Sequence, residues 1–173
     1  LRMAAQLLPG WRMDLLHSNR TGQHWIWKVP ASGGAALQVT HNVGFAAFES
    51  PDGAYLYYNQ TMETPSQLWC QPVSGGVPVK VLEGVVRAAF TVLDGGIYYI
   101  DRPSGEGGLL YTDLPSGETR LQYFDFATRR TTTVARNLGK VFLGLSASKD
   151  GRTILYSRVD SSLDDLMLVD NFR

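Results

Sequence analysis

The stretch SPDGAYLYY, residues 50–58, places a tight-turn formula directly before an apolar, aromatic run. Proline presets the backbone angle at the second turn position, aspartate suits the third through a bond to nearby backbone, and glycine tolerates the fourth. The aromatic run is rich in residues that favour strands. This stretch therefore predicts a strand, a tight turn and a second strand.

The same junction returns at TVLDGGIYYI, residues 91–100, and at SASKDGRTILYS, residues 146–157. Asp52, Asp94 and Asp150 consequently hold equivalent places in three copies of one pattern. We interpret these aspartates as turn residues rather than metal ligands or catalytic acids, because the turn chemistry accounts for them.

A second landmark, an apolar or aromatic pair that opens a short strand and a turn, keeps step with the first. It occurs at IWKVPASGG (residues 26–34), LWCQPVSGG (68–76), LQYFDFATRR (121–130) and LMLVDNF (166–172). Trp27 and Trp69 are 42 residues apart, and the next turn aspartate follows each of them by 25 residues. A period near 42 with short strands and almost no helical periodicity indicates propeller blades rather than helical repeats.

We therefore expect an all-β fold of β-propeller blades, each with four antiparallel strands, and about three and a half blades as part of a larger ring. The repeat units run roughly over residues 11–42, 43–84, 85–138 and 139–173. Aromatic side chains are expected in the core between blades, namely Trp25, Trp27, Phe48, Tyr57, Tyr58, Trp69, Phe90, Tyr98 and Tyr99.

The run SNRTGQHWIWKVPASGGAALQVTHNVGFAAFESPDGAYLYYNQ, residues 18–60, resembles the TolB-like, WD-repeat-like β-propeller repeat of bacterial proteins. The shared features are the SNR-G loop, the IW hairpin that ends in two glycines, the Q-x-T strand end and the SPDG turn. The ending DLMLVDNFR, residues 165–173, resembles the C-terminus of propellers attached to winged-helix transcriptional regulators. The resemblance covers nearly the whole chain and implies a bacterial protein of the cytoplasm or periplasm.

Closure of the ring is the physical difficulty for so short a chain. Propellers typically have about four to eight blades, and an open ring exposes a blade face and a strand edge. Repeats that cannot cover their apolar face alone need neighbours. We therefore expect missing N-terminal blades to complete the ring, and consider a four-bladed ring closed by the N-terminal segment the weaker alternative.

Composition excludes several classes of function. The 173 residues carry 16 basic and 16 acidic side chains, so no whole-chain field attracts nucleic acid or an anionic membrane. No apolar run approaches the roughly 20 residues that span a bilayer. Cys70, the one cysteine, makes neither an internal disulfide nor a metal site alone.

Candidate catalytic and metal residues are sparse, so we expect no catalytic residue, no metal and no cofactor. The three histidines, His17, His24 and His41, lie near strand ends without zinc-site spacing and are interpreted as solvated or hydrogen-bonded loop residues. No Gly-x-Ser-x-Gly motif occurs, and GLSAS (residues 144–148) falls in an expected inner strand. SGEGG (104–108) lacks a phosphate-loop ending, TRRT (128–131) fits a solvated turn, and SSLDDL (161–166) lacks the ligand density of a calcium loop.

Two patterns, Asn19 in NRT and Asn59 in NQT, match the N-glycosylation acceptor, which matters only in a secreted eukaryotic protein.

One segment departs from the repeat. About twelve extra residues lie between Asp101 and Arg120, and long loops on rigid scaffolds are where binding tends to reside. The candidate partner-contact residues of this loop are Arg102, Glu106, Tyr111, Asp113 and Arg120.

These observations favour a non-catalytic scaffold that offers its loops and central channel to a protein or peptide partner. The resemblance implies that it serves as the sensory module of a transcriptional regulator. A second hypothesis is the accessory propeller of a prolyl-oligopeptidase-like serine hydrolase, with the catalytic domain outside these residues. A third is a lectin-like binder of small ligands that uses exposed tryptophans. Fold alone does not decide among them.

Overall fold

The computed structural model describes residues 13–102 and 119–159 of the chain. These ranges form twelve strands and no helix. In chain order the strands are β1 (Met13–Ser18), β2 (Trp25–Pro30), β3 (Leu37–Gln38), β4 (Ala47–Glu49), β5 (Tyr55–Asn59), β6 (Ser66–Pro72), β7 (Val79–Leu93), β8 (Gly96–Asp101), β9 (Arg120–Asp125), β10 (Thr131–Arg136), β11 (Lys140–Ala147) and β12 (Ile154–Val159).

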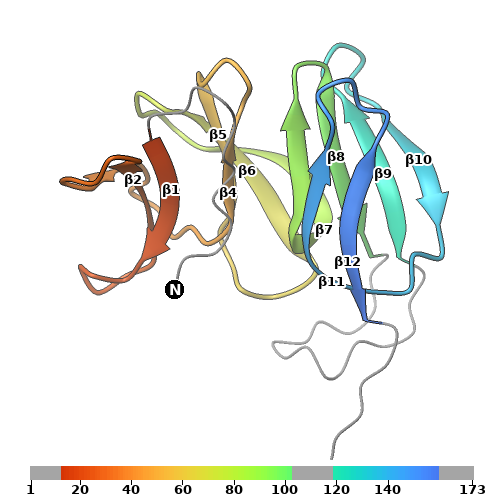
Figure 1. Ribbon diagram of the computed structural model, residues 1–173, viewed down its shortest axis with the longest axis horizontal. Helices are drawn as coiled ribbons and strands as arrows, with labels where there is room; N and C mark the ends of the chain where they lie inside the picture. Colours follow the sequence, from red (N-terminus) through yellow and green to blue (C-terminus); the bar gives the residue numbers. More distant parts are fainter. Residues whose placement is uncertain (1–12, 103–118, 160–173) are drawn as a thin grey trace, which may run out of the picture.

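All strand pairs are antiparallel, and the strands are arranged as successive blades (Figure 1). Blade 1 contains β1, β2 and β3. Blade 2 contains β4, β5, β6 and the first half of β7, and blade 3 contains the second half of β7 with β8, β9 and β10. The described part of blade 4 contains β11 and β12.

Blades 2 and 3 share one strand, so they form one seven-stranded sheet rather than the two separate four-stranded sheets expected from the repeat. β7 pairs with β6 from Val79 to Val85, and with β8 chiefly from Phe90 to Leu93. The backbone has a positive φ at Gly84 (74°), near the end of the first stretch, and at Ala88 (59°), between the two stretches. The chain thus passes from the outer strand of one blade to the inner strand of the next without an intervening loop.

The serine and aspartate turns form as the sequence predicts. Ser50 Oγ donates a hydrogen bond to Asp52 Oδ1 (2.6 Å), and the same carboxylate oxygen accepts the Ala54 N–H (3.0 Å). The later turn repeats this arrangement with Ser148 and Asp150. These hydrogen bonds also lower the pKa of both carboxyl groups.

Asp94 lies in the same hairpin position but in a different turn. Leu93 pairs directly with Gly96, so only Asp94 and Gly95 connect β7 to β8. A side chain at Gly96 would lie 2.2 Å from the Phe124 carbonyl oxygen, which explains why this shorter turn is followed by glycine. The equivalence of the three aspartates therefore holds for hairpin position and fails for turn geometry.

Apolar side chains fill the spaces between neighbouring blades. The largest cluster lies between blades 2 and 3 and includes Phe48, Tyr57, Phe90 and Tyr99, as expected. Phe48 meets Phe90 edge to face with ring centroids 4.8 Å apart. A second cluster, between blades 1 and 2, contains Tyr58, and Trp69 packs against this cluster. A third cluster lies between blades 3 and 4, and Tyr98 packs against it.

Trp27 is buried as expected and Trp25 is half-buried, but neither belongs to the cluster between blades 1 and 2. Successive side chains of a strand point to opposite faces, and Ile26 is the residue of β2 that enters the cluster between blades 1 and 2. The two tryptophans therefore lie on the face of blade 1 turned away from blade 2. The Trp27 side chain is nevertheless buried, with only 9% exposed, and the Arg20 guanidinium lies 4.8 Å from its ring centroid.

A buried ion pair also crosses between blades. Lys28 Nζ of β2 lies 2.5 Å from Glu49 Oε1 of β4, and the Glu49 side chain is almost fully buried. Because a buried charge is costly without its partner, this pair fixes the relative position of blades 1 and 2.

Asn59, at the end of β5, joins three separate segments. Its backbone pairs with Phe45 N–H and Ala46 C=O in the link from blade 1 (2.9 and 3.0 Å). Its side-chain amide donates to Ser66 Oγ (2.8 Å) and accepts from the Ala88 N–H of β7 (3.3 Å). Asn59 is fully buried, so these contacts have no competition from water.

We expect Asn59→Ala to lower the free energy of unfolding by about 2 to 4 kcal/mol, because several buried polar groups lose their partner at once. Urea unfolding followed by tryptophan fluorescence measures the change, with Asn19→Ala in an exposed turn as the matched control. Equal, small losses in the two variants would contradict the role given to Asn59.

We also expect the isolated chain to self-associate or to melt with low cooperativity. Among the described residues, blade 1 packs on blade 2 alone and blade 4 on blade 3 alone, so each lacks a neighbour on one side. Light scattering and thermal melting test this expectation. A sharply cooperative monomer would contradict an incomplete ring.

Candidate binding face at the loop end of the blades

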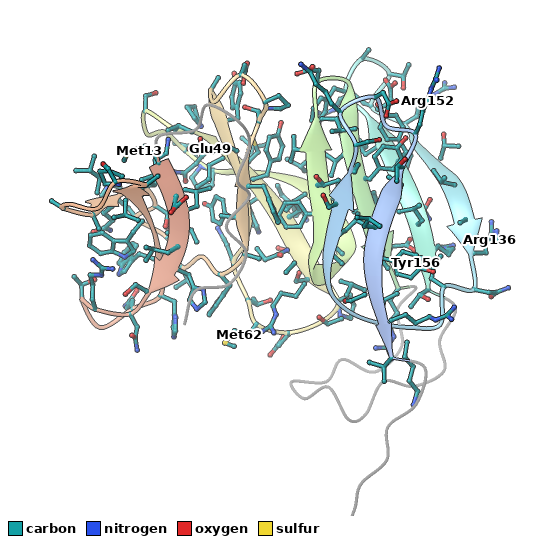
Figure 2. The ribbon with its side chains drawn as sticks, in the orientation of Figure 1. Met13, Glu49, Met62, Arg136, Arg152 and Tyr156 are labelled. Atoms are coloured by element: carbon teal, nitrogen blue, oxygen red, sulfur yellow. The ribbon has the colours of Figure 1, made fainter. Side chains whose placement is uncertain are left out.

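The antiparallel blades have two distinct ends. At one end, here called the turn end, lie the hairpins that join β4 to β5, β7 to β8 and β11 to β12. At the other, the loop end, lie the β1–β2, β5–β6 and β8–β9 connections and the links between blades. Figure 2 shows Glu49 and Arg152 at the turn end and Met62 and Arg136 at the loop end.

Charge is distributed unequally between these ends in the described part of the chain. Within the loop-end connections and the two strand residues next to them lie seven cations and two acids. The remaining described residues hold six cations and seven acids. The loop-end cations are Arg20, Arg87, Arg102, Arg120, Arg136, Lys140 and Arg158, and the acids are Glu63 and Asp101.

The predicted insertion opens from this end. The β1–β2 and β5–β6 connections each contain six residues, 19–24 and 60–65, whereas the β8–β9 connection contains 18, residues 102–119. The twelve extra residues expected from the repeat spacing are thus confirmed. Long loops on rigid scaffolds commonly carry binding residues.

The base of the insertion is clamped by hydrogen bonds. Arg120 donates two hydrogen bonds to the Asp101 carboxylate, from Nε to Oδ1 (2.9 Å) and from Nη2 to Oδ2 (2.6 Å). Gln122 Nε2 donates to the same carboxylate (3.1 Å). Bidentate arginine–carboxylate pairs have fixed geometry, so the two strand ends that carry the loop are held together.

The candidate partner-contact residues therefore divide into two groups. Arg102 is 5% exposed and its N–H donates to Gly84 C=O (3.2 Å), while Arg120 is half-buried in the clamp. Glu106, Tyr111 and Asp113 lie outside the described residues. A partner-contact role for this loop stays a prediction.

Two of the three histidines form a cluster that the sequence reasoning did not anticipate. The His17 and His24 ring centroids are 5.7 Å apart, and Phe45 lies 4.9 Å from His24 and 6.0 Å from His17. Both histidines are half-buried, and His24 Nδ1 is buried without a hydrogen-bond partner. Burial, followed by the nearby His24 and Arg87, lowers the pKa of His17.

The remaining sequence motifs have structural explanations. His41 is exposed and lies edge-on to Trp25. In TRRT, Asp125 Oδ1 accepts the Thr128 N–H at an exposed turn tip. Of the GLSAS serines, Ser146 belongs to the inner strand β11 and Ser148 to the turn that follows it. SGEGG and SSLDDL lie outside the described residues.

Cys70 and the glycosylation patterns are also accounted for by packing. Cys70 is half-buried, and burial raises the pKa of its thiol. Asn59 is fully buried with its amide engaged, so the folded chain does not present this residue to a glycosylating enzyme. Asn19 is exposed in its turn.

Within residues 13–102 and 119–159, no three His, Cys, Asp or Glu side chains gather closely enough to hold a metal ion. The same ranges contain no helix that is long and apolar enough to cross a membrane.

Comparison with known proteins identifies the fold. No protein-family model matches the chain, and a comparison with curated proteins finds no match. Among solved structures, a protein described as TolB from Agrobacterium tumefaciens aligns with a TM-score of 0.65 and 16% identity, over 91% of this chain and 60% of that one. The tricorn protease aligns with a TM-score of 0.57 and 12% identity, over 91% of this chain and 15% of that one.

An oligogalacturonate lyase from Vibrio parahaemolyticus aligns with a TM-score of 0.52 and 12% identity, over 73% of this chain and 37% of that one. This chain spans less than two thirds of each of these structures. At such identities the likeness concerns the fold. The protein is an all-β chain of propeller blades, and its β-propeller fold is TolB-like.

We expect the chain to lose stability below about pH 6.5, the ordinary pKa of histidine. The pKa of His17 is lowered in the folded state, so the unfolded chain binds more protons as the pH falls through 6.5 and is favoured. Urea unfolding at pH 7.5 and pH 5.5 measures the loss. His17→Gln should reduce it and His41→Gln should not; an unchanged pH dependence in His17→Gln would contradict this account.

Proposed function

We propose that this propeller portion is a non-catalytic scaffold whose loop end receives an acidic segment of a protein partner. The observation that carries the proposal is the excess of cations at that end, seven against two acids in the described residues. Complementary charge speeds the encounter of two proteins and fixes their orientation.

A polypeptide fits this end better than a nucleic acid. Phosphate backbones are bound by exposed lysine and arginine side chains along a continuous track. Here Arg87 and Arg102 are 6% and 5% exposed, and Arg120 is engaged by Asp101. The exposed loop-end cations, Arg20, Arg136, Lys140 and Arg158, are spread over blades 1, 3 and 4, which suits a few carboxylates on a folded or extended partner.

The 173-residue chain has no net charge, so only the uneven distribution of its charges could attract an acidic peptide. The acids that balance this excess lie, in sequence, in residues 103–118 and 160–173. Because the chain as a whole is neutral, binding of an acidic peptide would depend on where the cations of the chain lie. Failure of the chain to bind an acidic peptide would therefore count against the proposal.

Fluorescence anisotropy of a labelled oligoglutamate peptide, titrated with the full 173-residue chain, tests the binding face. We expect binding that weakens with salt and falls about tenfold in a Lys140→Glu, Arg20→Glu variant at the loop end. Both residues are exposed, as are Lys149 and Arg152, which supply the matched control reversal at the turn end. Equal losses from both reversals, or tighter binding of single-stranded DNA, would overturn the proposal.

The wider context of the scaffold is also a proposal. The C-terminal resemblance supports a sensory module of a transcriptional regulator, and the sequence of the native reading frame tests it through the presence of a DNA-binding domain. The rival context, an accessory propeller of a serine hydrolase, predicts that the native protein reacts with a fluorophosphonate probe. The likeness to the tricorn protease concerns the fold and favours neither context.

A further inference from the structure

The histidine cluster at the loop end is held in place by backbone contacts from two blades. His24 C=O accepts the Gly44 N–H (2.9 Å), and Asn59 C=O accepts the Phe45 N–H (2.9 Å). A side chain at Gly44 would lie 2.8 Å from Ile26 Cγ1, so the link packs tightly against β2. The rings of the cluster therefore sit on a fixed framework rather than on a free loop.

A buried arginine from another blade adds positive charge to the same region. Arg87 is 6% exposed, and its Nη1 donates to Met62 C=O (3.0 Å) while its backbone N–H donates to Thr64 Oγ1 (3.3 Å). Burial, then the nearby His24 and the charge of Arg87, lower the pKa of His17. Arg87 thus joins the start of the inner strand of blade 3 to the β5–β6 connection of blade 2.

The chemistry of the cluster suits an anion. The ion pairs found among the described residues join Lys28 to Glu49, Lys80 to Glu83 and Arg120 to Asp101, and none involves His17 or His24. His24 Nδ1 is buried and lacks a hydrogen-bond partner, which is costly unless a ligand supplies one. Phe45 adds an apolar surface beside the two imidazoles.

We propose that His17, His24 and Phe45 form a binding site for a carboxylate carried on a short apolar stem. The imidazoles bond the carboxylate oxygens and Phe45 packs against the stem. An acidic side chain and a C-terminal carboxylate share this chemistry. The inference rests on the proposed function in that the acidic partner would place one such carboxylate here.

NMR of the histidine ring protons of the full chain tests the site directly. The probes are N-acetylglutamate amide, which offers only a side-chain carboxylate, and N-acetylalanine, which offers only a C-terminal one. We expect one or both to shift the His17 and His24 signals saturably and to leave His41 unmoved. The probe that binds identifies the source of the carboxylate.

The variant that tests the site is His17→Gln, His24→Gln, with His41→Gln as the matched control. We expect at least a tenfold loss of probe affinity in the double variant and none in the control, measured through the backbone signal of Phe45. Equal shifts at all three histidines, no shift at any of them, or undiminished affinity in the double variant would overturn the inference.

The two proposals fail in distinguishable ways. If oligoglutamate binds and loop-end charge reversal weakens it while the His17 and His24 signals stay still, the scaffold proposal stands and the carboxylate site is wrong. If the small carboxylates bind at the histidines but oligoglutamate does not bind the chain, the site stands and the acidic partner is wrong.

Discussion

The described structure depends on one buried amide. Asn59 closes β5, receives the link from blade 1 and accepts a hydrogen bond from the strand that becomes the inner strand of blade 3. A side chain with both a donor and an acceptor is needed there, because the neighbouring groups are Ser66 Oγ and the Ala88 N–H. Ala88 has a positive φ of 59°, and its N–H points to this amide at the place where β7 leaves blade 2.

This constraint also shapes the loop end. Because Asn59 and Ser66 hold the two ends of the β5–β6 connection together, Met62 and Thr64 are positioned to bond Arg87. The backbone carbonyl of Asn59 accepts the Phe45 N–H and so fixes Phe45, which packs against the two histidines. The hydrogen bonds of Asn59 thus support both the fold and the candidate site. The charged residues near the site are those that the loop-end connections carry.

The repeat, the serine and aspartate turns and the twelve-residue insertion were predictable because they depend on local chemistry and spacing. Asp52 bonds backbone two residues away, and its turn forms as expected from four letters of sequence. The fusion of blades 2 and 3 through β7 was not, since nothing local distinguishes a strand that ends at Val85 from one that continues. The positions of Trp25 and Trp27 required knowing which face of β2 meets blade 2, which is a matter of packing between blades.

The candidate site shows the same division. His17, His24 and Phe45 are spread over 28 residues of sequence, and no motif joins them. Assigning each charged residue to a turn or to a connection would have revealed the cation excess, because antiparallel strands send alternate connections to opposite ends. The sequence by itself determined the blades and their turns through short-range hydrogen bonding and strand preference. Only the tertiary structure decided which side chains meet, because contacts between blades depend on strand faces and long-range packing.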